Sequence, residues 1–431
     1  MTDYVDSYYS RTISDDLRRP SLDSTVEAET CVVGGGLAGL AVALALAEAG
    51  RSAVLIEARR VGWGASGRNG GFVSPGYSLS LPKIERKLGP QTAKRLFQMS
   101  REAQALVRQR ADAAGIAREP GILKVNLAEH GEGLAPYVGR MNAVYGLALE
   151  HWPKDRVGAA LATTRYADGA YNPEAFRVHP LDLSRGFARL AEAKGVRLFE
   201  DTPAAGFGRE MGSRIVRTPR GRVRCRHAVI ACGGYIGGLD LRLAAATIPV
   251  ATYVAVTESL GKRLSETIRV PTAVSDVRLA SDYYRPLADG RILWGGRISV
   301  FHPGPERLKH IIRADMLQVY PQLADTRMEV AWGGWMAYAR HKMPCIGKLD
   351  DGIWYATCFG GHGLVATTVG GEMIASAIAA GDDRWRLLEP FGRPFVGGPV
   401  GKLPAQAVYW TLAAGDWFRR KRYEASEPRA A

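Results

Sequence analysis

The stretch VVGGGLAG at residues 32–39 decides the fold, because its glycines lie between an apolar run and a helical pattern. A glycine inside a regular element costs about 0.5–1 kcal/mol relative to alanine, so a cluster of glycines needs a backbone reason. The preceding AETCVV is typical of a buried strand, and the following LAGLAVALALAEAG is typical of a helix. SAVLIE, at residues 52–57, predicts a second strand. The segment therefore predicts a βαβ unit.

Three of these glycines, Gly34, Gly36 and Gly39, form the pattern GxGxxG between the strand and the helix. Glycines there permit a tight turn and the close approach of a pyrophosphate, whose charge meets the N–H groups at the helix N-terminus. Glu57 ends the second strand, where an acidic side chain accepts hydrogen bonds from a ribose diol. The alternative is a glycine turn without a ligand. Strand, helix and Glu57 together favour an adenine dinucleotide, but the motif does not distinguish FAD from NAD.

A second glycine-rich stretch, GWGASGRNGG at residues 62–71, favours FAD, because a nicotinamide nucleotide needs no such loop after the ribose-binding strand. With it the sequence resembles the D-amino-acid-oxidase-like family of FAD-dependent amine oxidoreductases, especially its gamma-glutamylputrescine oxidase branch. The resemblance covers nearly the whole chain. It rests on VVGGGLAG, Glu57, GWGASGRNGG, AVIACGG at residues 228–234 and FGGHGLVATT at residues 359–368.

The resemblance implies that the second loop lies beside the pyrophosphate and the isoalloxazine of FAD. We expect the FAD to be noncovalent, because ASGRN has no His or Cys at the positions that link the flavin in some relatives. The resemblance also implies that the helix starting near Leu364 points its N-terminus at the flavin pyrimidine edge, where a helix dipole stabilises the negative charge of the reduced ring. Cys358 is expected to face the core. The predicted cofactor-binding residues are Gly34, Gly36, Leu37, Ala38, Gly39, Glu57, Ala58, Arg59, Gly64, Ala65, Ser66, Arg68, Asn69, Gly70, Gly71, Ala231, Gly233, Gly361, His362, Gly363 and Leu364.

Candidate substrate residues lie in DYYRPL and in WGGWMAYARHKMPCIG. A flavin accepts the hydride itself, so amine oxidation needs aromatic walls and a polar anchor rather than a triad. The substrate-binding candidates are Tyr283, Tyr284, Arg285, Trp335 and Tyr338, and the catalytic candidates are Arg340, His341, Lys342 and His362. For the aromatic residues the alternative is the core of the lobe. The alternative for residues 340–342 is that they form a solvated loop. The alternative for His362 is a role in packing or in capping the helix.

The predicted fold class is α/β, with a Rossmann-type FAD-binding domain and an inserted, mainly antiparallel β-sheet substrate lobe plus helices. Alternating patterns over residues 248–296, with a DG turn at residues 289–290, indicate hairpins of this lobe. The predicted segments are an N-terminal extension at 1–29, the FAD-binding domain at 30–110, 181–240 and 341–390, the lobe at 111–180 and 241–340, and a tail with an amphipathic helix at 391–431.

Composition narrows the class of protein further. The net charge is +14, but the arginines are spread along the chain and only FRRKR at residues 418–422 forms a run, so no nucleic-acid binding is expected. Five cysteines without metal-ligand spacing indicate a reducing compartment and no metal. The N-terminus lacks the pattern of a secretory signal, and the apolar helix at residues 37–50 is too short to span a bilayer. We therefore expect a cytoplasmic protein without a transmembrane segment.

The expected activity is that of an FAD-dependent oxidoreductase, an oxidase using molecular oxygen. It would remove a hydride from the carbon next to an amine nitrogen, and the imine would hydrolyse to an aldehyde or keto acid plus an amine or ammonia. A gamma-glutamylputrescine-like or other primary or secondary amine is the expected substrate. One alternative is an α-amino or N-methyl amino acid. Another class is a non-catalytic, flavin-binding scaffold associated with a membrane surface through the basic C-terminal helix.

Overall fold

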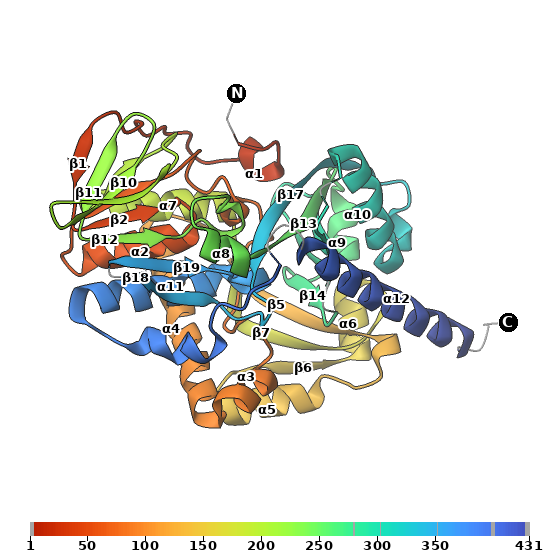
Figure 1. The fold of residues 1–431 in the computed structure, drawn as a ribbon. Coiled ribbons are helices and arrows are strands. Elements are labelled where there is room, and N and C mark those ends of the chain that lie inside the picture. Colours follow the sequence, from red (N-terminus) through yellow and green to blue (C-terminus); the bar gives the residue numbers. More distant parts are fainter. Residues whose placement is uncertain (1–3, 279–280, 302, 351, 398–400, 427–431) are drawn as a thin grey trace. The chain divides into compact units, whose positions relative to one another are not determined.

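In the computed structural model, residues 4–278, 281–301, 303–350, 352–397 and 401–426 are described. The ends of the predicted N-terminal extension and tail, residues 1–3 and 427–431, lie outside these ranges, as do residues 398–400. The chain divides into two compact units (Figure 1). Unit 1 comprises Met1–Arg118, Val178–Val250 and Gly334–Gly401, and unit 2 comprises Glu119–Arg177, Ala251–Gly333 and Lys402–Ala431.

Unit 1 is built on a six-stranded sheet whose strands are all parallel except β18 at one edge. In spatial order these strands are β18 (Cys345–Asp350), β19 (Ile353–Thr357), β12 (His227–Ile230), β2 (Thr30–Val33), β3 (Ala53–Ile56) and β8 (Arg197–Phe199). Every residue of β2 and β3 is buried, as expected for parallel strands with both faces covered. The GxGxxG pattern follows β2 directly, so the predicted βαβ unit is confirmed.

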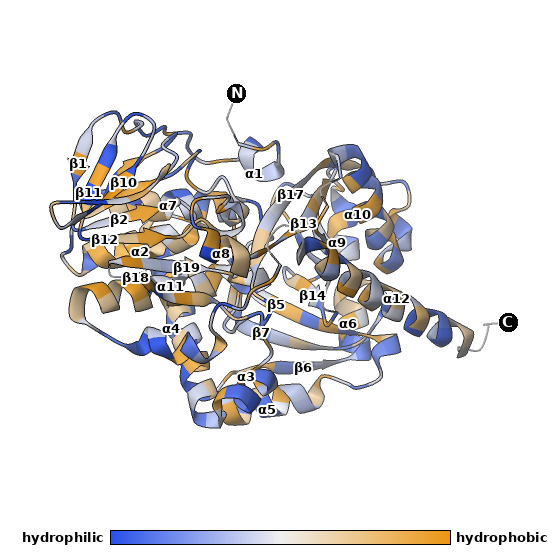
Figure 2. Ribbon diagram, viewed as in Figure 1, coloured by the Kyte–Doolittle hydropathy of each residue, from blue (hydrophilic) through white to orange (hydrophobic). Residues whose placement is uncertain are grey.

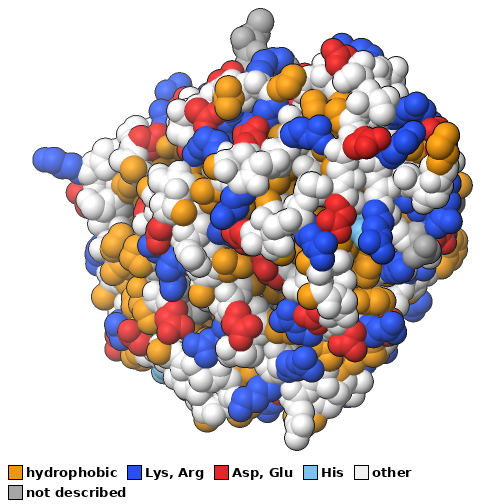
Figure 3. All heavy atoms as spheres, turned by 90° about the vertical axis from the view of Figure 1, so that its left-hand side faces the viewer, with side chains coloured by type: hydrophobic (Ala, Val, Ile, Leu, Met, Phe, Trp, Pro, Cys, Tyr) orange, Lys and Arg blue, Asp and Glu red, His pale blue; other side chains and the backbone are white. Residues whose placement is uncertain are grey.

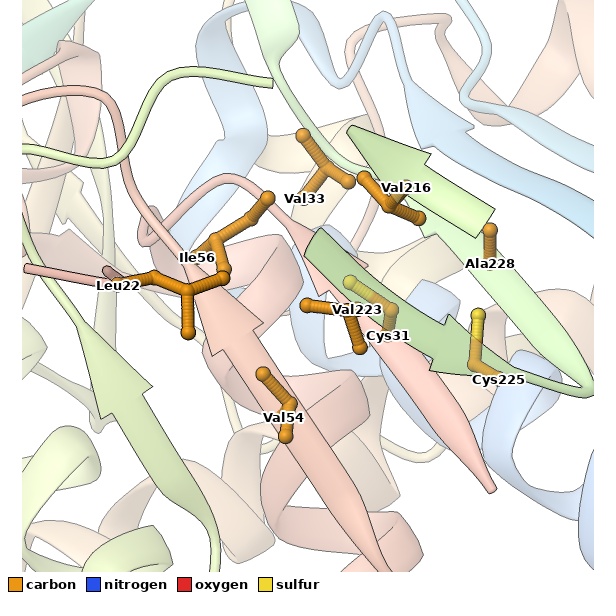
Figure 4. Packing of buried hydrophobic residues seen from close by; sticks show 9 residues of the cluster. All are labelled: Leu22, Cys31, Val33, Val54, Ile56, Val216, Val223, Cys225 and Ala228. Carbon is orange, nitrogen blue, oxygen red and sulfur yellow. The ribbon is translucent and has the colours of Figure 1, made fainter. Parts of the chain in front are cut away.

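A second, smaller sheet covers one face of the parallel sheet (Figure 1). Its strands are, in order, β1 (Thr25–Glu27), β11 (Arg222–Cys225), β10 (Ser213–Arg217) and β9 (Gly206–Glu210). Figure 4 shows the core between the two sheets, to which β2 contributes Cys31 and Val33, and β11 contributes Val223 and Cys225.

Helices cover the other face of the parallel sheet. The longer ones are α2 (Leu37–Glu48), α4 (Pro90–Ala113), α7 (Pro180–Ala193) and α11 (Gly363–Ala380). Helix α2 packs against α7 and α11 so closely that a methyl group built on Gly371 would lie 2.5 Å from the Ala41 side chain. Figure 2 shows α2 and α11 as predominantly hydrophobic. The remaining short elements of unit 1 are α1 (Tyr8–Arg11), η1 (Ala65–Gly67), β4 (Phe72–Val73), α3 (Leu81–Leu88), η3 (Gly233–Tyr235), α8 (Leu241–Ala246), η5 (Gly360–His362) and η6 (Arg384–Phe391).

One described helical stretch, Gly360–Ala380, is long and apolar enough by length and composition to cross a membrane. Of its apolar window, 61% is buried inside the protein, which is the behaviour of a core helix.

Unit 2 is built on a large and mainly antiparallel sheet. Its strands are, in order, β17 (Met328–Tyr338), β13 (Ile248–Thr257), β16 (Ile292–Ser299), β15 (Tyr283–Pro286), β14 (Ala273–Asp276), β5 (Arg118–Leu127) and β7 (Tyr166–Val178), with β6 (Glu150–Pro153) pairing with β7. Strands β14 and β5 form a parallel pair. Residues 334–338 of β17 belong to unit 1. This sheet confirms the predicted antiparallel lobe.

The helices of unit 2 include the C-terminal one, which the sequence had placed in a separate tail. They are η2 (Ala128–His130), α5 (Ala135–Tyr145), α6 (Lys154–Leu161), α9 (Lys262–Thr267), α10 (Pro305–Val319), η4 (Pro321–Leu323) and α12 (Lys402–Ser426). Helix α12 packs beside β16 and η2 of unit 2.

Candidate active site

The turn after β2 is held by backbone contacts that leave no room for a side chain. Gly34 has a φ of +112°, and a methyl group on it would lie 2.7 Å from the carbonyl oxygen of Ala231. A methyl group on Gly39 would lie 2.0 Å from the carbonyl oxygen of Gly34, and one on Gly36 would lie 2.9 Å from Ser66 Oγ. The three glycines of the motif therefore bring β2, the start of α2 and the neighbouring loops together at backbone distance.

Glu57, directly after β3, receives two backbone hydrogen bonds. Its Oε2 accepts from the Gly35 N–H at 2.6 Å, and its Oε1 accepts from the Arg59 N–H at 2.8 Å. Burial raises the pKa of Glu57, and these N–H groups oppose that rise. An ionised carboxylate has about four acceptor positions, so acceptor capacity remains for a ribose hydroxyl. Ala58 and Arg59, which follow Glu57, are exposed.

A buried carboxylate anchors the chain where it leaves Glu57. Glu200 is fully buried, accepts a hydrogen bond from the Val61 N–H at 2.8 Å and pairs with Arg60 at 2.9 Å. It also accepts from the Arg19 N–H at 3.1 Å, which fastens the N-terminal segment to the same point. Glu200 was not predicted from the sequence, because an acid that ends a short strand carries no signal of its distant partners.

The loop at residues 62–71 is stabilised by its own polar side chains. Asn69 Nδ2 donates to the carbonyl oxygens of Ala65 and Ser66 at 3.0 and 2.9 Å, and its Oδ1 accepts from the Gly71 N–H at 2.9 Å. Ser66 Oγ accepts from the Leu37 N–H at 2.9 Å, which ties the loop to the first turn of α2. The loop and α2 thus form one structure.

Arg68 folds back onto the same loop. Its Nε donates to the Trp63 carbonyl oxygen at 2.7 Å, and its guanidinium lies 4.2 Å from the centre of the Trp63 ring. Burial lowers the pKa of Arg68. The backbone of Gly64, Ala65 and Gly70 completes the loop between these contacts.

The turn after β12 approaches the first turn from the adjacent strand. The Ala231 N–H donates to the Val33 carbonyl oxygen at 2.8 Å, so the carbonyl of Ala231 faces Gly34. Gly233 follows with a φ of +54°. Tyr235 ends this turn, and its hydroxyl accepts a hydrogen bond from the Trp335 N–H at 3.2 Å.

The turn after β19 is enclosed by side chains from distant segments. Gly360 has a φ of +61°, and a methyl group on it would lie 2.4 Å from Ser78 Oγ and 2.6 Å from the Tyr338 ring. Ser78 Oγ accepts from the His362 N–H at 3.2 Å and donates to the Phe359 carbonyl oxygen at 3.2 Å. Helix α11 begins at Gly363, and no side chain caps its N-terminus. The first N–H groups of α11, including that of Leu364, are therefore available to an anion.

His362 and Tyr338 lie at this same turn. His362 Nε2 is 3.4 Å from Ser74 Oγ. The Tyr338 hydroxyl bonds to Ser78 and to the backbone of Gly361, yet burial dominates and raises its pKa, so the phenol stays neutral. The structure thus places Tyr338, a predicted substrate-binding residue, at the same turn as His362, which was predicted both to bind the cofactor and to be a catalytic candidate. Ser78 was not found from the sequence, since an isolated serine in a loop carries no signal.

The end of β17 lies next to three of the four turns described above. These are the loop at residues 62–71, the turn after β12 and the turn after β19. A methyl group on Gly334 would lie 3.4 Å from Arg68, the Trp335 backbone bonds to Tyr235, and Tyr338 packs on Gly360. Trp335 is half-buried. Residues 334–338 therefore form the part of unit 1 that lies alongside the candidate cofactor site.

The three ionisable residues after β17 occupy a tight turn. Arg340 is exposed. His341 Nδ1 accepts from the Met343 N–H at 3.0 Å, and its Nε2 lies 3.3 Å from the Gly392 carbonyl oxygen, so both ring nitrogens support the turn. Burial lowers the pKa of His341 and that of Lys342, whose φ is +63°.

The other substrate candidates lie on β15 of unit 2. Tyr284 is fully buried, stacks on Trp294 with 4.2 Å between ring centres, and its hydroxyl lies 2.9 Å from that of Tyr320. This places Tyr284 in the aromatic core of unit 2. Arg285 is buried as well, while Tyr283 is half-buried and lies over Gly295. These three residues and the pair Trp335 and Tyr338 thus belong to different units.

Two further observations concern the chemistry of unit 1. Cys358 is fully buried, and its Sγ lies 3.4 Å from Thr247 Oγ1. Among the described residues, no three His, Cys, Asp or Glu side chains gather as a metal site.

The residues of the glycine turns, Glu57 and the start of α11 are suited to bind FAD. Gly34, Gly36 and Gly39 form the tight strand–turn–helix that a dinucleotide diphosphate requires, and Glu57 retains acceptor capacity for a ribose. The uncapped N-terminus of α11 supplies donors for the electron-rich edge of a flavin.

The family model described as DAO, FAD dependent oxidoreductase, matches residues 29–377. The chain is 30% identical to the gamma-glutamylputrescine oxidoreductase of Escherichia coli over 96% of this chain and 99% of that protein. It is 24% identical to the glycine oxidase of Bacillus licheniformis over 84% of this chain and 96% of that protein. Among solved structures, the glycine oxidase of Geobacillus kaustophilus matches with a TM-score of 0.70 at 19% identity, covering 86% of this chain and 99% of that chain.

The chain therefore belongs to the DAO family of FAD-dependent oxidoreductases. This confirms the α/β flavoprotein fold, the FAD cofactor and an enzymatic function, and it corrects the alternative of a non-catalytic scaffold.

Proposed function

We propose that this enzyme oxidises an amine at the carbon next to the nitrogen, and that a gamma-glutamylated amine is its substrate. The observation that carries this proposal is the match to the gamma-glutamylputrescine oxidoreductase of Escherichia coli along nearly the whole of both chains. The matches to glycine oxidases support the alternative, a small α-amino or N-methyl amino acid. Both substrates carry an oxidisable C–H bond beside nitrogen.

The residues of unit 1 would divide the binding of FAD among four turns. The glycine turn and the N-terminus of α2 would hold the diphosphate, and Glu57 would hold the adenosine ribose. The first N–H groups of α11 would face the flavin edge. When bound, FAD supplies the two-electron acceptor, so the protein itself needs no nucleophile or metal.

The remaining work of unit 1 is to orient the amine. Tyr338 keeps its proton because burial raises its pKa, and beside its bonds to Ser78 and Gly361 its hydroxyl oxygen retains an acceptor position for an amine N–H. His341 has both nitrogens committed to its own turn, which leaves Tyr338 as the better anchor.

The proposal also includes molecular oxygen as the final electron acceptor and hydrolysis of the released imine by water. The five cysteines are free thiols, which agrees with a reducing, cytoplasmic location.

Anaerobic reduction of the holoenzyme tests the proposal. We expect a gamma-glutamylated diamine to bleach the flavin absorbance faster than glycine or an N-methyl amino acid does. Rapid return of the absorbance in air would identify an oxidase, and slow return a dehydrogenase. Faster bleaching by the amino acids would replace the proposed substrate with the alternative.

A further inference from the structure

Helix α12 is attached to unit 2 along one side only. Gln406 is buried, and its Oε1 accepts from the Ser299 hydroxyl at 3.0 Å and from the Val300 N–H at 2.9 Å. Further along the helix, Arg420 donates to Gln318 Oε1 at 2.5 Å. In Figure 1 the last turns of α12 extend past the strands of unit 2. The helix therefore has a bound side and an exposed side.

An apolar stripe follows the exposed side. It consists of Leu403, Ala407, Trp410, Ala414 and Trp417, which are spaced alternately by four and three residues. Residues at this spacing lie on one side of a helix. Leu403, Trp410 and Trp417 are 63%, 60% and 49% exposed, and Phe418, next to the stripe, is 58% exposed. Large aromatic side chains at this exposure are a binding surface rather than ordinary helix surface.

A cationic run continues directly from the stripe. Residues 419–422 are Arg-Arg-Lys-Arg, and residues 402–423 contain five Lys or Arg and one acid, Asp416. On the face shown in Figure 3, Lys and Arg side chains are interspersed with Asp and Glu. The positive charge of α12 is therefore concentrated beside exposed tryptophans.

We propose that α12 docks this enzyme on the surface of an anionic lipid bilayer. Tryptophan favours the boundary between headgroups and acyl chains, because its ring is apolar and its N–H remains hydrogen-bonded there. The exposed members of the cationic run, Arg419, Lys421 and Arg422, would bind anionic headgroups at the same depth, while Arg420 stays bonded to Gln318. A second copy packed in parallel on the stripe fits less well, since it would bring two runs of four like charges together. An antiparallel pair would show itself as a dimer in the test below. The stripe lies along the surface, and no part of α12 crosses the bilayer.

Flotation of the FAD-loaded enzyme with vesicles tests this inference. We expect the enzyme to float with vesicles of phosphatidylcholine and phosphatidylglycerol, not with phosphatidylcholine alone, and to be released by salt. A variant with Trp410→Ser, Trp417→Ser and Phe418→Ser should lose at least about tenfold in its partition coefficient. Arg422→Ala should lose about fivefold, as expected for one cation near an anionic surface.

Val408→Ser is the matched control, because Val408 is 60% exposed on the same helix but lies off the stripe. It should bind vesicles like the unaltered enzyme, and all variants should keep their flavin and their amine turnover. Failure of the unaltered enzyme to float with anionic vesicles would overturn the proposal. Equal flotation of the triple variant would also overturn it, as would a dimer, seen by light scattering, that the triple variant abolishes.

Discussion

Unit 1 contains two strand–turn–helix glycine turns that differ in what encloses them. One joins β2 to α2, the other joins β19 to α11, and the two helices pack against each other. Gly34 and Gly39 of the first turn face backbone atoms of Ala231 and Gly34, and only Gly36 among the three motif glycines faces a side chain, that of Ser66. The second turn is enclosed at Gly360 by the side chains of Ser78 and Tyr338. The contact between Gly34 and Gly39 lies within one short stretch of sequence, although Ala231 reaches the first turn from β12. Ser78 and Tyr338 come from distant segments and bring polar groups to the start of α11.

The largest expected effect comes from breaking the first turn. In Gly39→Ala the added methyl group would lie 2.0 Å from the Gly34 carbonyl oxygen, so strand and helix must separate. We expect a loss of about 3 kcal/mol in the free energy of unfolding, together with loss of FAD. Urea unfolding and the flavin absorbance of the purified protein measure both.

Gly363→Ala is the matched control at the second turn, because no neighbouring heavy atom lies within 4 Å of a methyl group there. Its free energy of unfolding without FAD should change by less than about 1 kcal/mol. Equal losses in the two variants would contradict the contrast between the turns.

The next effect concerns Glu57. In Glu57→Gln only one oxygen can accept, so either the Gly35 N–H or the Arg59 N–H loses its partner. The amide also takes away the charge and an acceptor that a ribose hydroxyl would use. A lost hydrogen bond to a charged group costs about 1.5–3 kcal/mol, so the Kd for FAD should rise about 10- to 100-fold. Fluorescence titration of the apoprotein with FAD measures this. Glu27→Gln removes the same charge from a residue whose side chain is 69% exposed on β1, and should leave the Kd unchanged.

The first turn could be predicted from the sequence because its determinants are close together in the chain. GxGxxG, the strand before it and Glu57 lie within a few dozen residues, and their spacing reflects the βαβ geometry itself. The antiparallel lobe was predictable for a related reason, since hairpins pair neighbouring segments. Glu200 was not predictable, because it supports Val61 across a separation of 139 residues.

Of the second turn, only the glycines could be predicted from the sequence. Tyr338 shares an aromatic pattern with Tyr284, yet Tyr338 packs on Gly360 while Tyr284 lies in the core with Trp294. Alternation along a strand does not distinguish a wall of a site from a core face, because both are apolar. Ser78 lies far from residues 359–362 in sequence, so its hydrogen bonds appear only in three dimensions.

A smaller effect should follow from removing one hydroxyl at the second turn. Tyr338→Phe keeps the ring that packs on Gly360 and removes the group that bonds to Ser78. We expect kcat/KM for the amine to fall about tenfold with no change in the Kd for FAD. Combining it with Ser78→Ala makes a double-mutant cycle, and additive losses would show that the two residues act independently.

The smallest effect concerns His341, whose pKa is lowered by burial and by Lys87, while the Gly392 carbonyl raises it. The unfolded chain has a histidine pKa of about 6.5, so between the lowered value and about 6.5 the unfolded state binds more protons. The contribution of neutral His341 to the free energy of unfolding is therefore present above about pH 6.5 and is lost as the pH falls. The reason is that a protonated Nδ1 cannot accept a hydrogen bond from the Met343 N–H. His341→Asn keeps an acceptor for an N–H two residues on and does not titrate. Urea unfolding at about pH 7 and about pH 5 measures how much the free energy of unfolding falls between the two pH values. This decrease should be larger for the unaltered protein than for the variant. The difference should be small, because water screens a half-buried side chain. An equal loss would mean that Nδ1 does not support the turn, and His341 would then be free to act on substrate beside Tyr338.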